Sequence, residues 1–66
     1  MPPFVRYQYE VRSVVRVTSD PKHAWQVTWR GSLLCADRIR RPVYRLDNEY
    51  WDVYFEDELR SAWNGM

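Results

Sequence analysis

Arginine is the residue type in this sequence whose clustering points most directly to a chemistry. Each guanidinium is a planar fork of N–H donors that matches the oxygens of a phosphate. Gathered along one edge of a small domain, such groups would bind the backbone of a nucleic acid. The residues predicted to do so are Arg12, Arg30, Arg38, Arg40, Arg41 and Arg45. The alternative is an ordinary charged surface, on which the arginines pair with Asp37, Asp47 and Asp52.

A second set of residues suits a protein partner. Exposed tyrosines make good interface anchors, and carboxylates can imitate the phosphates that a nucleic-acid-binding groove expects. The candidate partner-binding residues are Tyr50, Tyr54, Glu56, Asp57 and Glu58. The alternative for the acidic stretch is a helix start, where carboxylates offset the positive end of the helix dipole.

Catalytic and metal-binding patterns find no support in the sequence. His23 is the only histidine and Cys35 the only thiol, so no Ser/Cys–His–acid spacing and no zinc tetrad can be drawn. Two glycines do not make a phosphate-binding loop. We therefore expect no enzyme activity, no metal and no cofactor. An active site at the centre of a symmetric oligomer is the one arrangement that such motifs would not reveal.

Length and composition predict one small domain, residues 1–66. A chain this short buries only about 60% of the surface that its unfolded form exposes. Its four Trp, five Tyr and two Phe are the material for the core, and association of identical copies would be a second source of stability. A single cysteine excludes an internal disulfide. Without a signal peptide or a long apolar run, we expect a cytoplasmic protein with no membrane partner.

The net charge of +1 hides a strong asymmetry along the chain. Residues 1–46 hold nine Lys/Arg and three acids, which gives +6, while residues 47–66 hold one Arg and six acids, which gives −5. A basic face on the first two-thirds would attract phosphates.

Alternating apolar residues predict strands in the first half of the chain. We expect one from Phe4 to Thr18, bent near Arg12–Val15 because a straight strand of that length would run roughly 46 Å. A turn over Ser19–His23 would start a hairpin. Its expected register places Val17 opposite Trp25, Val15 opposite Val27 and Ser13 opposite Trp29, with the strand ending at Gly31.

The second half predicts a further hairpin, Val43–Phe55. With its turn at Asn48-Glu49, Tyr44 would face Val53 and Leu46 would face Trp51; a four-residue loop over Asp47–Tyr50 is the alternative. Between the hairpins, Ser32–Arg41 fits either a short helix or, as we favour, a brief strand and a turn. The tryptophans expected in the core are Trp25, Trp29, Trp51 and Trp63.

After the second hairpin, Glu56-Asp57-Glu58 predicts a helical turn that continues with Leu59, Ala62 and Trp63 on one face. The expected fold class is therefore mainly β: a small SH3-like barrel of four or five antiparallel strands with a short C-terminal helical turn.

One stretch resembles a known family. The pattern Val43-x-x-Leu46-Asp47-Asn48-x-x-Trp51-Asp52-Val53-Tyr54-Phe55, preceded by Trp29-Arg30-Gly31 and by Glu10-Val11-Arg12, resembles the C-terminal SH3-like barrel of insertion-sequence transposases related to retroviral integrases. Glu49 stands where the family has a turn glycine, and the segment from Gly31 to Val43 is shorter. The resemblance implies an accessory DNA-contacting role, with Arg12 and Arg30 at the matching basic positions. It implies no chemistry, because nothing like the family's catalytic domain is present.

The sequence therefore predicts a small non-catalytic module that binds DNA through an arginine-rich edge. The alternative is a protein-binding module or inhibitor, of the kind that phage and mobile-element genes encode, which acts through exposed aromatics and the acidic C-terminal end.

Overall fold

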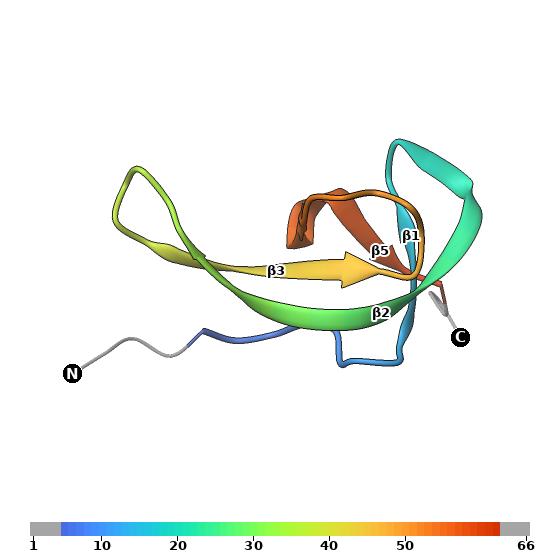
Figure 1. Ribbon diagram of the computed structural model, residues 1–66, viewed down its shortest axis with the longest axis horizontal. Helices are drawn as coiled ribbons and strands as arrows, with labels where there is room; N and C mark the ends of the chain where they lie inside the picture. The colour runs from blue at the N-terminus through green and yellow to red at the C-terminus, as the bar shows by residue number, and fades with distance from the viewer. Residues whose placement is uncertain (1–4, 63–66) are drawn as a thin grey trace.

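The computed structural model describes residues 5–62, which form five strands and one turn of 3-10 helix. All strand pairs are antiparallel, and the order across the sheet is β4-β3-β2-β1-β5 (Figure 1). The elements are β1 Val14–Val17, β2 Asp20–Leu34, β3 Arg40–Leu46, β4 Tyr54–Phe55, η1 Glu56–Glu58 and β5 Leu59–Ser61. The mainly β fold with five antiparallel strands and one short helical turn is thus confirmed.

The long strand β2 joins two halves of the sheet. Its first part pairs with β1, where Val15 lies opposite Trp25, and its second part pairs with β3, where Val27 lies opposite Leu46. Between them the strand curves strongly, which Figure 1 shows as the sweep of the green ribbon. This bend wraps the sheet around one core, while η1 connects the two edge strands, β4 and β5.

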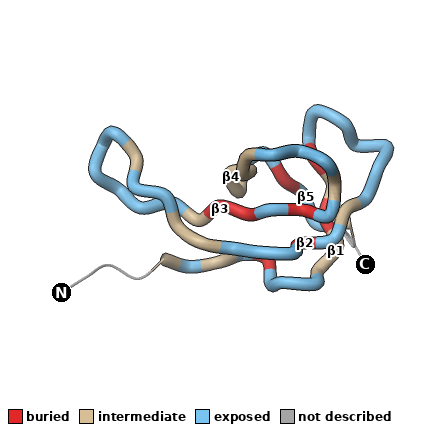
Figure 2. The backbone as a smooth tube through the Cα atoms, viewed as in Figure 1, coloured by how far each residue is buried: buried red, intermediate tan, exposed pale blue. Residues whose placement is uncertain are grey.

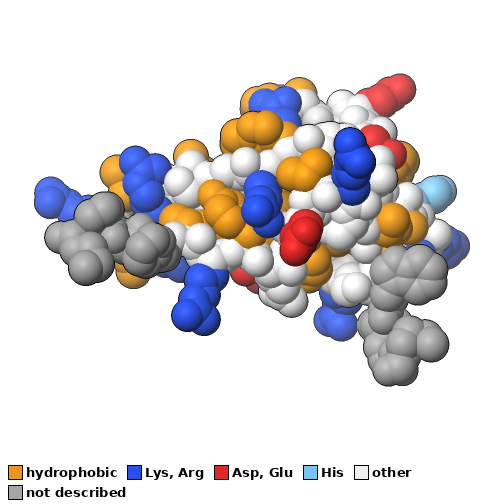
Figure 3. Space-filling view, turned by 90° about the horizontal axis from the view of Figure 1, so that it is seen from below, with side chains coloured by type: hydrophobic (Ala, Val, Ile, Leu, Met, Phe, Trp, Pro, Cys, Tyr) orange, Lys and Arg blue, Asp and Glu red, His pale blue; other side chains and the backbone are white. Residues whose placement is uncertain are grey.

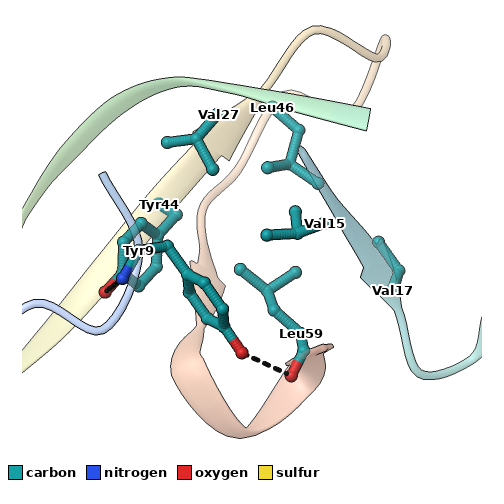
Figure 4. Close-up of a cluster of buried hydrophobic side chains, with 7 residues drawn as sticks. All are labelled: Tyr9, Val15, Val17, Val27, Tyr44, Leu46 and Leu59. Carbon is teal, nitrogen blue, oxygen red and sulfur yellow. Dashed lines mark hydrogen bonds between the residues drawn. The ribbon is translucent and has the colours of Figure 1, made fainter. Parts of the chain in front are cut away.

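The core consists mainly of aliphatic residues on the concave side of the sheet (Figures 2 and 4). Val15, Val27 and Tyr44 are the most completely buried side chains. Alternation along β1 turns Val15 and Val17 inward, as the strand period requires. The full cluster is Tyr9, Val15, Val17, Val27, Tyr44, Leu46 and Leu59. Tyr7, Trp25 and Tyr54 pack against it while remaining partly exposed.

A hydrogen-bond network around Tyr44 ties the N-terminal segment to the barrel. The Tyr44 hydroxyl donates to Glu56 Oε2 at 2.5 Å and accepts from the backbone N–H groups of Gln8 at 3.0 Å and Tyr9 at 3.3 Å. The Gln8 N–H also donates to Glu56 at 2.8 Å, and the Tyr9 hydroxyl donates to the Leu59 carbonyl at 3.3 Å (Figure 4). Burial and the bond to the Glu56 carboxylate raise the pKa of Tyr44 to about 12. The network holds β3, η1 and residues 8–9 together.

The long first strand is predicted wrongly. Residues 5–13 form no strand, and Phe4 lies outside the described residues. The bend is near the predicted place: a turn at Val11 and Arg12 precedes β1, with Arg12 at a φ of 83° and the Ser13 N–H bonded to the Glu10 carbonyl at 3.0 Å. The alternation of Tyr7 and Tyr9 therefore reflects packing of an extended tail onto the core.

Both predicted hairpin registers are also wrong. In β1 and β2, Val15 lies opposite Trp25 and a bulge follows Arg16, so the pairing is displaced by two residues and the apolar faces still match. In β3 and β4, Tyr44 lies opposite Tyr54 and not Val53. This one-residue slip leaves residues 47–53 as a loop and puts Trp51 in solvent, 77% exposed.

The core position predicted for Trp29 is wrong as well, and a bulge explains why. Val27 lies opposite Leu46, but Trp29 lies opposite Arg45, so Thr28 is an extra residue in β2. One extra residue reverses the alternation, which turns Trp29 to the outer face, 47% exposed. Trp25 does pack against the core, and Trp63 lies outside the described residues.

Two element boundaries differ from the prediction: the end of β2 and the end of the helical turn η1. β2 does not end at Gly31 but continues to Leu34, so the strand-and-turn interpretation of residues 32–41 is confirmed. The helical turn at Glu56–Glu58 is confirmed, but it does not continue. Leu59 instead begins β5 and lies opposite Val17, because that pairing buries its side chain in the core.

We expect Tyr44→Phe to lower the free energy of unfolding by about 1–3 kcal/mol, since it removes a buried hydrogen bond to a carboxylate. Because the pKa of Tyr44 is raised in the folded state, the protonated hydroxyl is the form that stabilises the fold. The contribution of Tyr44 to the free energy of unfolding is therefore complete below pH 10 and is lost as the pH rises toward 12. Urea unfolding of both proteins at several pH values measures this difference.

Tyr54→Phe is the matched control. The Tyr54 hydroxyl only accepts a bond from the Asn48 side chain, at 3.1 Å, and the residue is half-buried, so we expect a smaller loss. Equal losses in the two variants, or a difference that does not depend on pH above 10, would contradict the role given to Tyr44.

Candidate nucleic-acid interface

The β2–β3 hairpin extends past the barrel and carries most of the predicted phosphate-binding residues. We call residues 32–41, the outer part of this hairpin, the arginine arm; it projects at the left of Figure 1. Arg38, Arg40 and Arg41 are exposed there, and Asp37 is the only acid in the arm. In Figure 3 this end of the molecule shows basic and hydrophobic side chains together, while the acidic side chains in view lie over the barrel.

The tip of the arm is a tightly bonded loop. The Arg38 N–H donates to the Cys35 carbonyl at 2.9 Å, and the Cys35 N–H donates to the Ile39 carbonyl at 3.1 Å. Arg38 has a φ of 67°, so three residues turn the chain in the geometry of a type I turn followed by a left-handed residue. The Asp37 side chain accepts the Ile39 N–H at 3.1 Å. These bonds give the loop one defined conformation.

Two of the arm's guanidinium groups are held by neighbours. Arg41 forms an ion pair with Asp37, and Arg40 donates to the Ser32 hydroxyl at 3.2 Å. The Ile39 N–H, together with Arg41, lowers the pKa of Asp37, and Asp37 raises the pKa of Arg41. An ion pair this exposed adds little to stability. Its effect is to orient Arg41.

Arg45 extends the basic surface toward the barrel. It lies on β3 four residues after Arg41, on the same face of the strand, and directly opposite Trp29. The Trp29 indole lies over Gly31, in space that any Cβ at that position would occupy. Arg45 therefore continues the basic surface of Arg41 along the outer face of β3, on which Trp29 is also exposed.

Arg12 and Arg30 lie apart from this group. The Arg30 guanidinium stacks over the Tyr7 ring, 4.6 Å from its centroid, and donates to the Tyr9 carbonyl at 3.2 Å. Arg12 lies in the turn before β1, where its N–H donates to the Val27 carbonyl at 2.7 Å. Arg38, Arg40, Arg41 and Arg45 thus lie along one hairpin, with Arg41 and Arg45 on one face of β3 and Arg40 on the other. Arg30 instead has a role in fixing the N-terminal segment.

The predicted partner-binding residues are largely committed to the fold. Tyr54 packs against the core, with the Tyr50 ring 4.7 Å away. Glu56 accepts bonds from Tyr44 and Gln8. Glu58 accepts the Phe55 N–H at 2.8 Å and so caps η1. Of the five, Tyr50 and Asp57 are exposed without such a bond from their side chains within residues 5–62.

Sequence reasoning missed several exposed apolar residues. The pattern predicts Trp51 and Trp29 in the core, whereas both are exposed, and Leu33, Leu34 and Ile39 are exposed as well. Two signals were available in the sequence. Consecutive leucines in a strand must point to opposite faces. The polar residues on both sides of Trp51, from Asp47 to Asp52, favour a loop over a tight hairpin.

The groups that could do other chemistry are separated. His23 contacts Asp20 at 3.0 Å and stacks on Trp25 near the start of β2, while Cys35 follows the end of the same strand. Within residues 5–62, no three His, Cys, Asp or Glu residues lie close enough to hold a metal ion. The same residues contain no helix with the length and hydrophobicity needed to span a bilayer.

No protein-family model matches the sequence, and comparisons with curated proteins and with solved structures found no match. The geometry of the arginine arm therefore carries the functional argument.

The left-handed residue in the arm leads to a stability prediction. A side chain at positive φ costs roughly 1–2 kcal/mol, whereas glycine adopts it freely but loses about 0.4–1 kcal/mol through the unfolded chain. We expect Arg38→Gly to raise the free energy of unfolding by about 0.5–1 kcal/mol, measured by urea unfolding. Arg40→Gly is the control, because it removes the same charge from a strand and should destabilise. Equal destabilisation by both variants would contradict the loop geometry.

Proposed function

We propose that this protein is a small non-catalytic DNA-binding module that contacts phosphates through its arginine arm. The observation that carries the proposal is the exposure of Arg38, Arg40, Arg41 and Arg45 along residues 32–46, which contain a single carboxylate, Asp37. Residues 32–46 therefore have a net charge of +4 − 1 = +3. A projecting strand pair with this charge is complementary to the negative surface of a duplex.

The partners of these arginines support the same function. Within residues 5–62, the Arg38 and Arg45 side chains form no ion pair or hydrogen bond, and Arg40 bonds only to a neutral hydroxyl. Their charge is therefore available to a phosphate. Arg41 is held in one orientation by its ion pair with Asp37. The resemblance to a transposase barrel points to the same role, although its matching position Arg30 is engaged by Tyr7 and Tyr9 in this fold.

The direct test is the salt dependence of binding to random duplex DNA. Each phosphate contact releases counterions, so the slope of log K against log salt should change by about 0.9 per contact. We expect each of Arg38→Gln, Arg40→Gln and Arg45→Gln to weaken binding near 50 mM salt and to reduce the slope by about one. Electrophoretic mobility shift across a salt series measures both quantities.

Lys22→Gln is the matched control. It removes one positive charge near the start of β2, away from the arm, and its side chain is exposed. We expect its slope to match that of the unmodified protein. Absence of binding at low salt, or an equal loss in the control, would contradict the proposal.

A second candidate function rests on Trp51. A tryptophan 77% exposed in the loop of residues 47–53, with the Tyr50 ring 6.3 Å away and itself exposed, is typical of a hot spot for a protein partner. In this alternative the chain is a protein-binding module or inhibitor of a phage or mobile element, and Asp57 offers an exposed carboxylate on η1 to a basic partner.

Trp51→Ala separates this candidate from DNA binding. Because its side chain contributes little to the core, the free energy of unfolding should stay within about 0.5 kcal/mol. Affinity for duplex DNA should also be unchanged. If the second candidate is right, the unmodified chain retains a protein stoichiometrically from nuclease-treated lysate, and Trp51→Ala does not. Val11→Ala is the control, because Val11 is another exposed apolar residue. Retention of the same protein by Trp51→Ala would exclude this loop as its binding site.

A further inference from the structure

The arginine arm exposes three aliphatic side chains among its charges. Leu33, Leu34 and Ile39 are 44%, 56% and 53% exposed. Leu33 and Leu34 are consecutive in β2, so they point to opposite faces of the ribbon, and Ile39 lies at its tip. A flat partner would cover only one of these faces. The pattern suits an occupant that surrounds the end of the ribbon.

We propose that the tip of the arm enters the minor groove of duplex DNA and that Ile39 inserts there as an apolar wedge that bends the duplex. This rests on the proposed DNA binding and specifies its mode. Minor-groove proteins commonly combine arginines with an aliphatic wedge that unstacks one base step and bends DNA by about 20–90°. Arg38 and Arg40 are the neighbours of Ile39 in the chain, so two cationic residues border the wedge.

The loop is built to hold the wedge in place. Both backbone polar groups of Ile39 are bonded: its N–H to Asp37 at 3.1 Å, and its carbonyl to the Cys35 N–H at 3.1 Å. Little conformational entropy therefore remains to be lost at this residue on binding. The cost of a positive φ falls on Arg38, where glycine would fit the turn better. A strained residue that supplies a phosphate-binding side chain is consistent with a functional loop.

The positions of the charges favour a DNA groove over a lipid surface. The charged residues alternate with the apolar ones at this end of the ribbon: Arg40 lies opposite Leu34, Arg41 lies opposite Leu33, and Asp37 and Arg38 lie in the loop itself. The tip therefore has no continuous apolar cap. Insertion into lipid deep enough to bury Ile39 would also desolvate these charges, at a large cost. In a groove, the arginines can bind phosphates and Asp37 stays paired with Arg41.

Bending is the property that distinguishes a wedge from simple phosphate contacts. A duplex of about 25 base pairs with a central TA step, labelled with a fluorescent donor and acceptor at its two ends, should show increased energy transfer when saturated with protein. We expect Ile39→Ala to reduce this increase at least two-fold while the salt slope is unchanged. Ile39→Leu should restore it, because it returns an aliphatic side chain of the same size.

Val11→Ala is the control, since it shortens an exposed apolar side chain outside the arm. Saturable binding with no bending, or equal bending by Ile39→Ala, would overturn the wedge and leave DNA binding intact. No binding at low salt would overturn the proposed function as well. Binding to vesicles of phosphatidylserine and phosphatidylcholine that is weakened by Ile39→Ala, with no bending of DNA, would overturn the wedge in favour of a lipid surface.

Discussion

The hydrogen bond from the buried Tyr44 hydroxyl to Glu56 is the contact on which this fold most depends. A five-stranded sheet in so small a chain has two edges, β4 and β5, and few apolar residues with which to close around a core. Tyr44 links β3 to η1, and its oxygen also accepts the N–H groups of Gln8 and Tyr9. One side chain thereby joins the middle of the sheet, the turn between its edges and the N-terminal segment.

Some charged residues stabilise the fold, while others of the same type are left exposed to solvent. Arg30 and Glu56 satisfy backbone and aromatic partners within the barrel. The arginines of the arm have no comparable task, because the hairpin continues past the core and no other strand lies beyond it. The acidic end of the chain is likewise used internally, through Glu56 and Glu58. The charge asymmetry in the sequence therefore leaves an exposed basic arm and an acidic turn of which Glu56 and Glu58 are hydrogen-bonded within the fold.

The sequence predicted the fold class and part of the candidate site, for identifiable reasons. Alternation of apolar residues revealed the strands, and the cluster from Arg38 to Arg45 revealed the basic hairpin. Registers could not be predicted, because bulges after Arg16 and at Thr28 carry no sequence signal strong enough to find them. The bulge at Thr28 alone moved Trp29 from the core to the surface. Tertiary bonds to Tyr7 and Tyr9 likewise decided the role of Arg30, which local pattern does not encode.

The central claim is that the exposed arginines of the arm, and not the acidic end or the aromatic loop, meet the nucleic acid. NMR titration of the labelled protein with a short duplex tests it residue by residue. We expect the largest chemical-shift changes at the guanidinium resonances of Arg38 and Arg40 in the arm, at that of Arg45 next to the arm, and at the backbone amides of residues 35–41. Changes concentrated at Tyr50, Trp51 and Asp57, with the arm unaffected, would contradict the account.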